Sequence, residues 1–470
     1  MAKLELNEYR LFDPEPGVRK IARELYEQVK DLPIISPHGH VDPMILADNK
    51  PFPDPTELIL IPDHYAHRML YSQGVPLESL GIPSVDGTPV EKDHRKIWQI
   101  FGDHFYLFAG TPTGVWLNHE FYEVFGIREK FNGQSALRIY DQIQEKLNSP
   151  EFLPRALFKC FNIEVLSTTD GASDTLEQHK KIKESGWDGR VVPCLRPDAI
   201  VSITAPNWKP EINKLEKTVG YEISSFKNYI RAIEDRRKFF KAMGATSTDQ
   251  GVYSPYTHEL NEAEAEAVFQ RGLKGQASED DGNLFTAHML MEMARMSVED
   301  GLVMQIHPGS FRNHNQVVFK RFGADKGCDI PVATEYTNNL RALLNKYGYN
   351  PALTLIVFTL DETTYARELA PLAGHYPALR LGPAWWFHDS YQGMTRYRQM
   401  VTETAGIYNT VGFNDDTRAF PSIPARHDVS RRVDSNFLAR MVTSHLIDME
   451  EAQKLSKALA YELVKKAYKL

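Results

Sequence analysis

Cysteine is scarce in this chain, and long apolar runs are missing. Only three cysteines occur among 470 residues, and Cys160, Cys194 and Cys328 are too scattered for a disulfide framework or a CxxC metal knuckle. No segment approaches the roughly 18 uninterrupted apolar residues of a membrane span. The stretch 1–20 also lacks the apolar core of a signal peptide. We therefore expect a protein without a membrane segment, in a reducing cytoplasm.

An excess of basic residues is missing as well. The 54 lysines and arginines are outnumbered by 62 aspartates and glutamates, which gives a net charge of −8 and argues against nucleic acid as a partner. Internal repeats, low-complexity tracts and long Gly/Ser linkers do not occur. With 42% hydrophobic residues, 24 Phe and 21 Tyr, the composition is that of a globular chain with a substantial core.

Several catalytic motifs are also absent. The sequence has no glycine-rich phosphate-binding loop, no GxSxG nucleophile elbow and no Cys/His dyad. These absences argue against nucleotide-dependent chemistry and against acyl-enzyme chemistry.

The sequence does contain an alternation of short apolar runs with amphipathic segments. The eight runs predicted as strands are 33–36, 163–169, 190–195, 245–248, 302–307, 353–359, 379–385 and 408–414. Apolar residues at helical 3–4 spacing follow most of them, for example over 174–184, 224–243 and 284–298. This alternation predicts an α/β fold, and eight is the number of strands that closes a (β/α)8 TIM barrel. Strand counting alone leaves a doubly wound open sheet as the alternative.

One interval breaks the alternation. The stretch 41–162 separates the first two predicted strands, whereas a crossover between parallel strands needs only about 10–12 residues. It is rich in proline, aromatic residues and helical patterns such as 136–148. We expect residues 45–155 to form a mainly helical insertion near the barrel mouth, within a single domain that spans residues 1–470. Two amphipathic helices are expected over 434–470.

Polar residues capable of chemistry follow nearly every predicted strand. In barrels of this kind, functional residues lie at the carboxyl ends of the strands. The residues found there are His38, His40, Asp170, Arg196, Asp198, Asp249, His307, Arg312, Trp385, Trp386, His388, Asp389, Asp415, Asp416 and Arg418. To gather histidine, carboxylate and arginine on one rim is costly unless a site uses them.

The pair His38-x-His40 is the first candidate metal site. Residues two apart in an extended strand face the same side, so both imidazoles can reach one ion. A carboxylate from the eighth strand, which neighbours the first strand in a closed barrel, can supply a third ligand, and we favour Asp416 over Asp415. With 16 histidines in the chain, such a pair can also arise by chance. Its position at a predicted strand end favours a site.

Other polar groups allow more than one interpretation. His307 can be a fourth ligand, a base, or a core histidine bonded to a backbone carbonyl. The cluster 63–68 either closes over the mouth or is a solvated loop that begins a helix. The Trp385-Trp386 pair is interpreted as core or pocket wall and not as a catalyst. Three arginines at strand ends either pair with nearby aspartates or clamp an anionic substrate; they are Arg196, Arg312 and Arg418.

Several short sequence blocks, taken in their order along the chain, resemble those of one protein family. They are His38-Gly39-His40, Asp63-His64-Tyr65 with Arg68, Trp116 with Glu120, Thr168-Thr169-Asp170, Arg196-Pro197-Asp198, His307 with Arg312-Asn313, Trp385-Trp386-Phe387 with Asp389, and Asp416 with Arg418 and Arg426-His427. The sequence is similar to the uronate isomerases (glucuronate isomerases), a divergent branch of the amidohydrolase superfamily of metal-dependent (β/α)8 barrels.

The resemblance implies an aldose–ketose isomerase, which catalyses an intramolecular oxidoreduction. Its implied substrates are small sugar acids: D-glucuronate with D-fructuronate, and D-galacturonate with D-tagaturonate. Such a reaction removes a proton from C2, passes through a cis-enediol and returns a proton to C1, a task for a carboxylate that can hold the same proton. A homo-oligomer is implied as well. The alternative within the superfamily is a hydrolase, in which a metal activates water against a lactone or an amide.

The implied site holds one divalent metal ion, and ligation by two nitrogens and an oxygen favours zinc. Its expected ligands are His38, His40 and Asp416, and Asp416 is also the expected proton shuttle. The other expected catalytic residues are Tyr65, His307 and Arg418. The residues expected to bind the substrate are His64, Arg196, Asp249, Arg312, Arg418 and Trp386.

Overall fold

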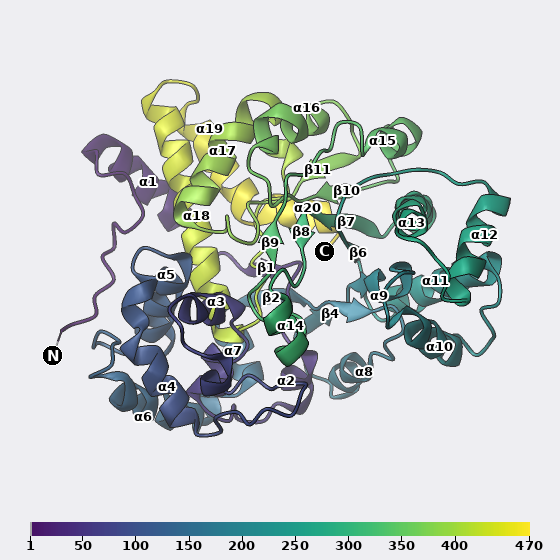
Figure 1. Ribbon diagram of the computed structural model, residues 1–470. Helices are drawn as coiled ribbons and strands as arrows, with labels where there is room; N and C mark the ends of the chain where they lie inside the picture. Colours follow the sequence, from purple (N-terminus) through teal and green to yellow (C-terminus); the bar gives the residue numbers. More distant parts are fainter. Residues whose placement is uncertain (1) are drawn as a thin grey trace.

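The computed structural model describes residues 2–470 and shows an α/β fold built on parallel strands (Figure 1). The strands are β1 (Ile34–Ser36), β2 (Ile163–Ser167), β3 (Asp170–Gly171), β4 (Arg190–Val192), β5 (Leu195–Arg196), β6 (Ser247–Val252), β7 (Val303–Pro308), β10 (Leu355–Val357) and β11 (Leu379–Leu381), with a small antiparallel pair of β8 (Ser310–Phe311) and β9 (Ile330–Pro331). Seven of the eight predicted strands are thereby confirmed; the run 190–195 forms β4 and the start of β5, and β3 begins just beyond the run 163–169.

The parallel strands pair in the order in which they occur along the chain. One sheet runs β1-β2-β4, and the other runs β3-β5-β6-β7-β10-β11. Because β3 closely follows β2 and β5 closely follows β4, the same two chain segments belong to both sheets. The order contains no reversal, whereas a doubly wound sheet needs one at its switch point. The carboxyl ends of the strands therefore succeed one another in chain order.

The prediction of an eighth strand over 408–414 is wrong. Thr410 makes only an isolated parallel bridge with Leu381, and no strand is assigned to this segment. The physical reason is Gly412, whose φ of 80° lies in the left-handed region and interrupts an extended ladder. The β-branched and aromatic residues around it favour a strand by composition, but one glycine bends the chain away.

Between β1 and β2 the chain is helical, and these helices lie at the lower left of Figure 1. They are α2 (Pro43–Asp48), α3 (His64–Ser72), α4 (His94–Asp103), α5 (Pro112–His119), α6 (Ala136–Leu147) and α7 (Pro154–Cys160). The Asp63 side chain begins α3 by accepting from the backbone N–H groups of Tyr65 and Ala66. Apolar faces of these helices pack in one core with Leu166 of β2, which fixes α3 relative to the strands.

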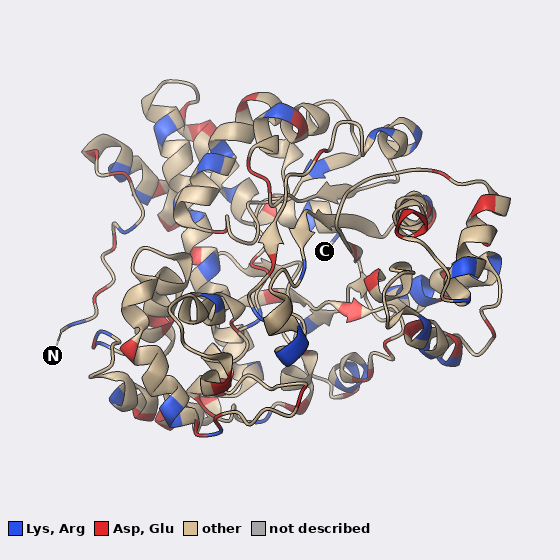
Figure 2. Ribbon diagram, in the orientation of Figure 1, with Lys and Arg blue, Asp and Glu red and all other residues tan. Residues whose placement is uncertain are grey.

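The remaining helices cover the strands from the outside. Between strands lie α8 (Glu177–Glu184), α9 (Asp198–Val201), α10 (Trp208–Val219), α11 (Phe226–Ala242), α12 (Glu262–Leu273), α13 (Glu279–Asp300), α14 (Gln316–Phe322), α15 (Arg341–Tyr347) and α16 (Ala370–Ala373); α17 (Tyr391–Ala405), α18 (Ile423–Thr443), α19 (Met449–Lys457) and α20 (Leu463–Tyr468) follow β11. Figure 2 shows acidic and basic residues interspersed on these helices. Within residues 2–470, no helix combines the length and the apolar character needed to cross a membrane.

The segment before β1 packs against a helix from near the other end of the sequence. The N-terminal helix α1 (Pro16–Val29) packs against α18 (Figure 1). Arg431 of α18 donates hydrogen bonds to the carbonyl oxygens of Lys30, Leu32 and Pro33, at 2.7 to 3.1 Å. The helix predicted near 434 therefore begins earlier, at Ile423, and it holds the chain immediately before β1.

One apolar cluster contains side chains from strands at both ends of the strand order. Its members include Ile35 of β1, Val165 of β2, Val303 of β7, Ile356 of β10, Val411, and Tyr468 of α20. The Tyr468 hydroxyl donates to Oε1 of Gln305 at 2.9 Å. Gln305 precedes His307 by two residues on the same face of β7, so α20 lies on the amino-terminal side of the candidate site.

Candidate active site

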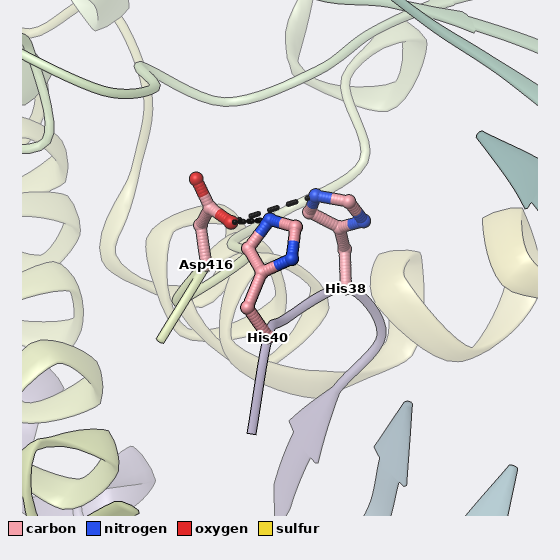
Figure 3. A group of neighbouring side chains, drawn as sticks. All are labelled: His38, His40 and Asp416. Atoms are coloured by element: carbon pink, nitrogen blue, oxygen red, sulfur yellow. Dashed lines mark ion pairs between the residues drawn. The ribbon is translucent and has the colours of Figure 1, made fainter. Parts of the chain in front are cut away.

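The segments after β1 and after the eighth apolar run bring three candidate ligands together. His40 N–H donates to the carbonyl oxygen of Thr417 at 2.8 Å, which places the two segments side by side. The Asp416 Oδ1 lies 3.5 Å from Nε2 of His38 and 3.2 Å from Nε2 of His40 (Figure 3). The three side chains point toward one another from two segments of the chain, as ligands of a single ion do.

The Asp416 carboxylate is ionised and held in one orientation. Burial alone would raise its pKa, but His40 and His38 outweigh burial and lower the pKa below the usual value. Its Oδ2 accepts a hydrogen bond from the indole Nε1–H of Trp385 at 2.8 Å, while Oδ1 has no hydrogen-bond donor among the described residues. Two imidazole nitrogens that face an anionic oxygen without a donor form a set that fits a divalent cation.

The neighbouring Asp415 points elsewhere. Its Oδ2 lies 3.0 Å from Nε2 of His427 in α18, and its side chain is completely buried. Of the two aspartates, Asp416 is therefore the one that lies beside His38 and His40.

His307 belongs to a buried chain of charged groups. Its Nδ1 lies 2.5 Å from Oδ1 of Asp249, whose Oδ2 lies 3.2 Å from Nη1 of Arg196, and Arg196 Nε donates to Asp198 at 2.7 Å. Burial opposes the ionisation of Asp249, but Arg196 and His307 keep its pKa well below the usual value. The partner of His307 is thus a carboxylate and not a backbone carbonyl.

The proton positions on His307 follow from this pairing. A carboxylate can only accept, so His307 donates from Nδ1. Burial lowers the pKa of His307 despite the nearby Asp249, and the ring is therefore neutral. Its buried Nε2 carries a lone pair and has no partner within residues 2–470. The ring stacks on His38, with centroids 4.6 Å apart, which places this lone pair next to the candidate ligands.

Tyr65, at the start of α3, is held by a network from three other elements. Its hydroxyl donates to Asp389 at 3.1 Å, and Asp389 lies 3.0 Å from Nη1 of Arg426 in α18. The Arg426 guanidinium lies 3.6 Å from the ring centre of Trp116 in α5. Burial, assisted by Asp389, raises the pKa of Tyr65 well above its usual value. The phenol is therefore protonated, and its hydrogen points to Asp389.

A cavity of about 720 Å³ brings most of the predicted site residues to one surface. Its lining includes His38, His40, His64, Tyr65, Arg196, His307, Arg312, Trp385, Trp386, Asp416 and Arg418. Asp249 is wholly buried and does not line the cavity; it reaches the lining through Arg196 and His307. Burial and the charge of Arg418 lower the pKa of His64 to about 3, so this ring is neutral as well.

Two arginines of the cavity retain donors for a ligand. Arg312 Nη1 donates to Asp329 at 2.8 Å, and its guanidinium lies 5.3 Å from the ring centre of Trp386. Arg418 has one distant ion-pair contact, with Asp325 at 3.8 Å. Because a guanidinium has five N–H donors, both side chains can still bind a carboxylate.

Sequence reasoning gave no catalytic or binding role to several residues that this geometry singles out. They are Asp325, Trp385, Asp389 and Arg426. Trp385, Asp389 and Arg426 belong to the motif blocks, which could have marked them as site residues. Asp325 stands in no block: it lies in a loop with φ of 59°, and only the folded chain places it between two arginines of the cavity.

Glu120, just after α5, is a buried carboxyl group beside the Tyr65 network. It is 1% exposed, and its Oε2 has no partner among the described residues. Burial raises its pKa to about 8, against the opposing charge of Arg426. At neutral pH the folded chain therefore holds a proton that the unfolded chain, with the usual value of 4.5, has released. Stability should fall as pH rises between these two values, by about 1.4 kcal/mol per pH unit for one proton.

We expect Glu120→Gln to remove this part of the pH dependence. The amide mimics the neutral acid, so the variant should match the wild type at pH 5 and exceed its stability at pH 8. Urea unfolding at the two pH values measures this. Glu123→Gln, an exposed neighbour on the same turn, is the matched control and should change neither value. If the wild type and Glu120→Gln lose stability equally between pH 5 and pH 8, Glu120 is ionised in the folded chain.

Comparison with known proteins agrees with the motif blocks and with this geometry. The sequence model of the glucuronate isomerase family matches residues 17–468. The chain belongs to this family. A uronate isomerase of Nostoc punctiforme is 57% identical over 462 residues, which cover 98% of either chain. The resemblance found in the sequence is confirmed.

Solved structures of two family members have the same fold. The glucuronate isomerase of Caulobacter crescentus superposes with a TM-score of 0.98 at 54% identity, over 99% of this chain and 97% of that one. The uronate isomerase of Thermotoga maritima superposes with a TM-score of 0.92 at 28% identity, over 99% of each chain. These comparisons do not favour the hydrolase alternative.

Proposed function

We propose that this chain is a uronate isomerase, an aldose–ketose isomerase that interconverts D-glucuronate with D-fructuronate and D-galacturonate with D-tagaturonate. The observation that carries the proposal is the presence, in one cavity, of three side chains that could hold a cation and of guanidinium groups with free donors. Incubation with D-glucuronate should yield the ketose. If no ketose forms with any of zinc, manganese or cobalt present, the proposal fails.

The proposed cofactor is one divalent ion, zinc, with His38, His40 and Asp416 as its ligands. The support is the convergence of their ligand atoms, which lie within 4.8 Å of one another, and the preference of mixed nitrogen and oxygen ligands for zinc. When bound, such an ion stabilises negative charge on substrate oxygens and lowers the pKa of a coordinated hydroxyl group.

Asp416 is the proposed proton shuttle. The open-chain aldose has an acidic C2–H beside its aldehyde, and a carboxylate next to C2 can take this proton and return it to C1 of the cis-enediol. Asp416 suits this role because it is ionised and because Trp385 fixes the plane of its carboxylate. Each carboxylate oxygen has two lone pairs, so Oδ2 can accept the C2 proton while it stays bonded to Trp385.

The reaction must also move a hydroxyl proton from O2 to O1. His307 is proposed to assist, because its neutral ring has a free lone pair and Asp249 stabilises the imidazolium that would form. Tyr65 donates to Asp389 and accepts from the backbone N–H of Phe387 at 3.2 Å. The remaining lone pair of Tyr65 is proposed to orient a substrate hydroxyl group.

The other predicted site residues are proposed to bind the substrate. Arg418 and Arg312 supply N–H donors to its anionic oxygens, and Arg418 also stabilises enediolate charge. Arg196 and His64 face the same cavity and are assigned to substrate hydroxyl groups. Trp386 forms the wall beneath Arg312, and Asp249 acts through Arg196 and His307.

We expect the enzyme to select carboxylated sugars over neutral ones. D-glucose lacks the carboxylate that pairs with Arg312 and Arg418, so its kcat/KM should be lower than that of D-glucuronate by a factor on the order of 10² or more. Steady-state kinetics with the two sugars measures the ratio. Equal turnover of glucose or xylose would show that the arginines do not act as an anion clamp.

We further propose that the strands close into a (β/α)8 barrel in a single domain, residues 1–470, with residues 45–155 as a helical insertion near the mouth. The unreversed strand order supports this, as does the inner cluster shared by Ile35 and Val411. The hydrogen bond from His40 N–H to the carbonyl oxygen of Thr417 supports closure between the segment after β11 and the segment after β1.

The enzyme is proposed to act in the cytoplasm as a homo-oligomer, on a small-molecule substrate, without a nucleic-acid or membrane partner. The acidic net charge argues against a nucleic-acid partner, and the low cysteine content fits the cytoplasm; the homo-oligomer is proposed from the family resemblance. Light scattering of the purified protein measures the oligomeric state.

A further inference from the structure

A second cavity lies beside the candidate active site. Its volume is about 760 Å³, against about 720 Å³ for the first. Each alone lies in the range of about 300–1,000 Å³ that holds a small ligand, so together they have room for more than one sugar unit. The two cavities share five lining residues: Asp198, Ser202, Gly251, Val252 and Tyr253. They therefore adjoin at the carboxyl end of β6.

The two cavities are separated by the backbone of β6 and by the ion pair of Arg196 with Asp198, which lies against it. Asp198 Oδ1 accepts from Gly251 N–H at 2.9 Å. A Cβ at position 251 would lie 2.5 Å from Nη2 of Arg196 and 2.6 Å from Oδ2 of Asp198, so only glycine lets the pair lie directly on the strand. Arg196 lines the active-site cavity, whereas Asp198 lines both.

The chemistry of the second cavity differs from that of the first. Its lining contains no lysine, arginine or histidine, but it contains Asp198 and Glu279. A second anionic ligand is thereby excluded, because nothing would offset its charge. Polar groups without a positive charge line it instead, and they include Ser254, Asn283, Thr286 and Asn339. Tyr253 and Tyr256 add aromatic rings that are 60% and 38% exposed. Hydroxyl, amide and aromatic groups together suit a neutral, hydroxyl-rich ligand.

Gln250 lines this cavity and has an unpaired polar group. The residue is 3% exposed, and its Nε2 donates to Oγ1 of Thr248 at 2.9 Å. Its Oε1 has no partner among the described residues. A buried acceptor costs free energy unless a donor reaches it, so a turn of this side chain toward a ligand hydroxyl group in the cavity would be favourable.

We propose that the second cavity is a subsite for a neutral hexosyl unit attached to the uronate, so that the enzyme also isomerises a uronate at the reducing end of a disaccharide. The inference rests on the proposed function. C1 and C2 react beside the cation site, and the carboxylate pairs with the arginines. The hexosyl unit is then carried by an oxygen between these two ends, and we take the C4 oxygen as the one whose substituent passes the wall at β6.

The experiment compares D-glucuronate with 4-O-hexosyl-D-glucuronate as substrates. Asn283→Trp fills the second cavity from an exposed position on α13 and does not touch the active-site cavity. Asn345→Trp, at an exposed position on α15 that lines neither cavity, is the matched control. For the wild type we expect kcat/KM values within about tenfold of each other for the two substrates. Asn283→Trp should lose at least about tenfold on the disaccharide and nothing on glucuronate, and Asn345→Trp should match the wild type on both.

Each other outcome has a defined meaning. If the wild type isomerises glucuronate but the disaccharide is neither converted nor inhibitory, the subsite is refuted while the proposed function stands. If Asn283→Trp converts the disaccharide as the wild type does, the hexosyl unit lies elsewhere and the subsite is again refuted. If glucuronate itself is not isomerised, the proposed function fails, and calorimetry with the disaccharide decides the subsite: weaker binding by Asn283→Trp supports it, and equal binding refutes it.

Discussion

Asp416→Asn should reduce the turnover of D-glucuronate by a factor on the order of 10² or more, in line with general-base contributions. Asparagine keeps the size of the side chain and one carbonyl oxygen, but it cannot take the proton from C2. Exchange of the C2 hydrogen with solvent should fall together with turnover, because both need the same proton transfer. Turnover, hydrogen exchange and metal content are measured on the same preparation, since Asp416 is also a proposed ligand.

A second variant tests how much the orientation of the Asp416 carboxylate contributes, apart from its role as a base. Trp385→Phe removes the indole donor to Oδ2 of Asp416 and leaves the carboxylate in place. We expect a smaller loss, on the order of tenfold, with the metal retained. A metal-loaded Asp416→Asn enzyme that turned over near the wild-type rate would move the base role to His307 or Tyr65.

The double variant His38→Ala/His40→Ala should bind no divalent ion and should have no measurable activity. Both imidazole Nε2 atoms face Oδ1 of Asp416, and one carboxylate alone does not hold zinc at the affinity of a three-residue site. Elemental analysis after dialysis measures the metal per chain, with an expected value of one for the wild type.

A matched pair of surface histidines controls for the loss of imidazole as such. His375 and His445 are exposed and lie outside both cavities, so His375→Ala/His445→Ala should keep the ion and the activity. If the His38→Ala/His40→Ala protein retained a full equivalent of metal, the ion would be bound elsewhere and the proposed ligand set would be wrong.

Positions at strand ends were predictable from sequence, because a local rule covers them. An apolar run that ends in His38-x-His40 implies a strand followed by two side chains on one face, and the structure places both rings beside Asp416. The same rule failed at residues 408–414, where composition favours a strand. Gly412 is left-handed where a Cβ would lie 2.7 Å from the carbonyl oxygen of Leu459, and the sequence pattern does not reveal this distant contact.

Interactions between distant segments were not predictable in the same way. Asp389 joins Tyr65 to Arg426, and these residues come from the insertion, from the end of β11 and from α18. No spacing rule relates them, so the motif blocks could name the residues but not their partners. A role for Asp325 could not be predicted from the sequence, because nothing distinguishes it from other loop aspartates. Only the folded structure places it near Arg312 and Arg418.

The contact of α1 with α18 affects the order in which parts of the protein can fold during synthesis. Arg431 bonds the backbone just before β1, and α1 packs on α18, so this segment has its partners about 400 residues later in the chain. Contacts this distant in sequence form late. Strand β1 can pair with β2 once residue 167 has been made, but α1 and the backbone just before β1 lack their partners until α18 has been made. A stop codon before residue 423 would therefore also remove the α18 surface on which α1 packs.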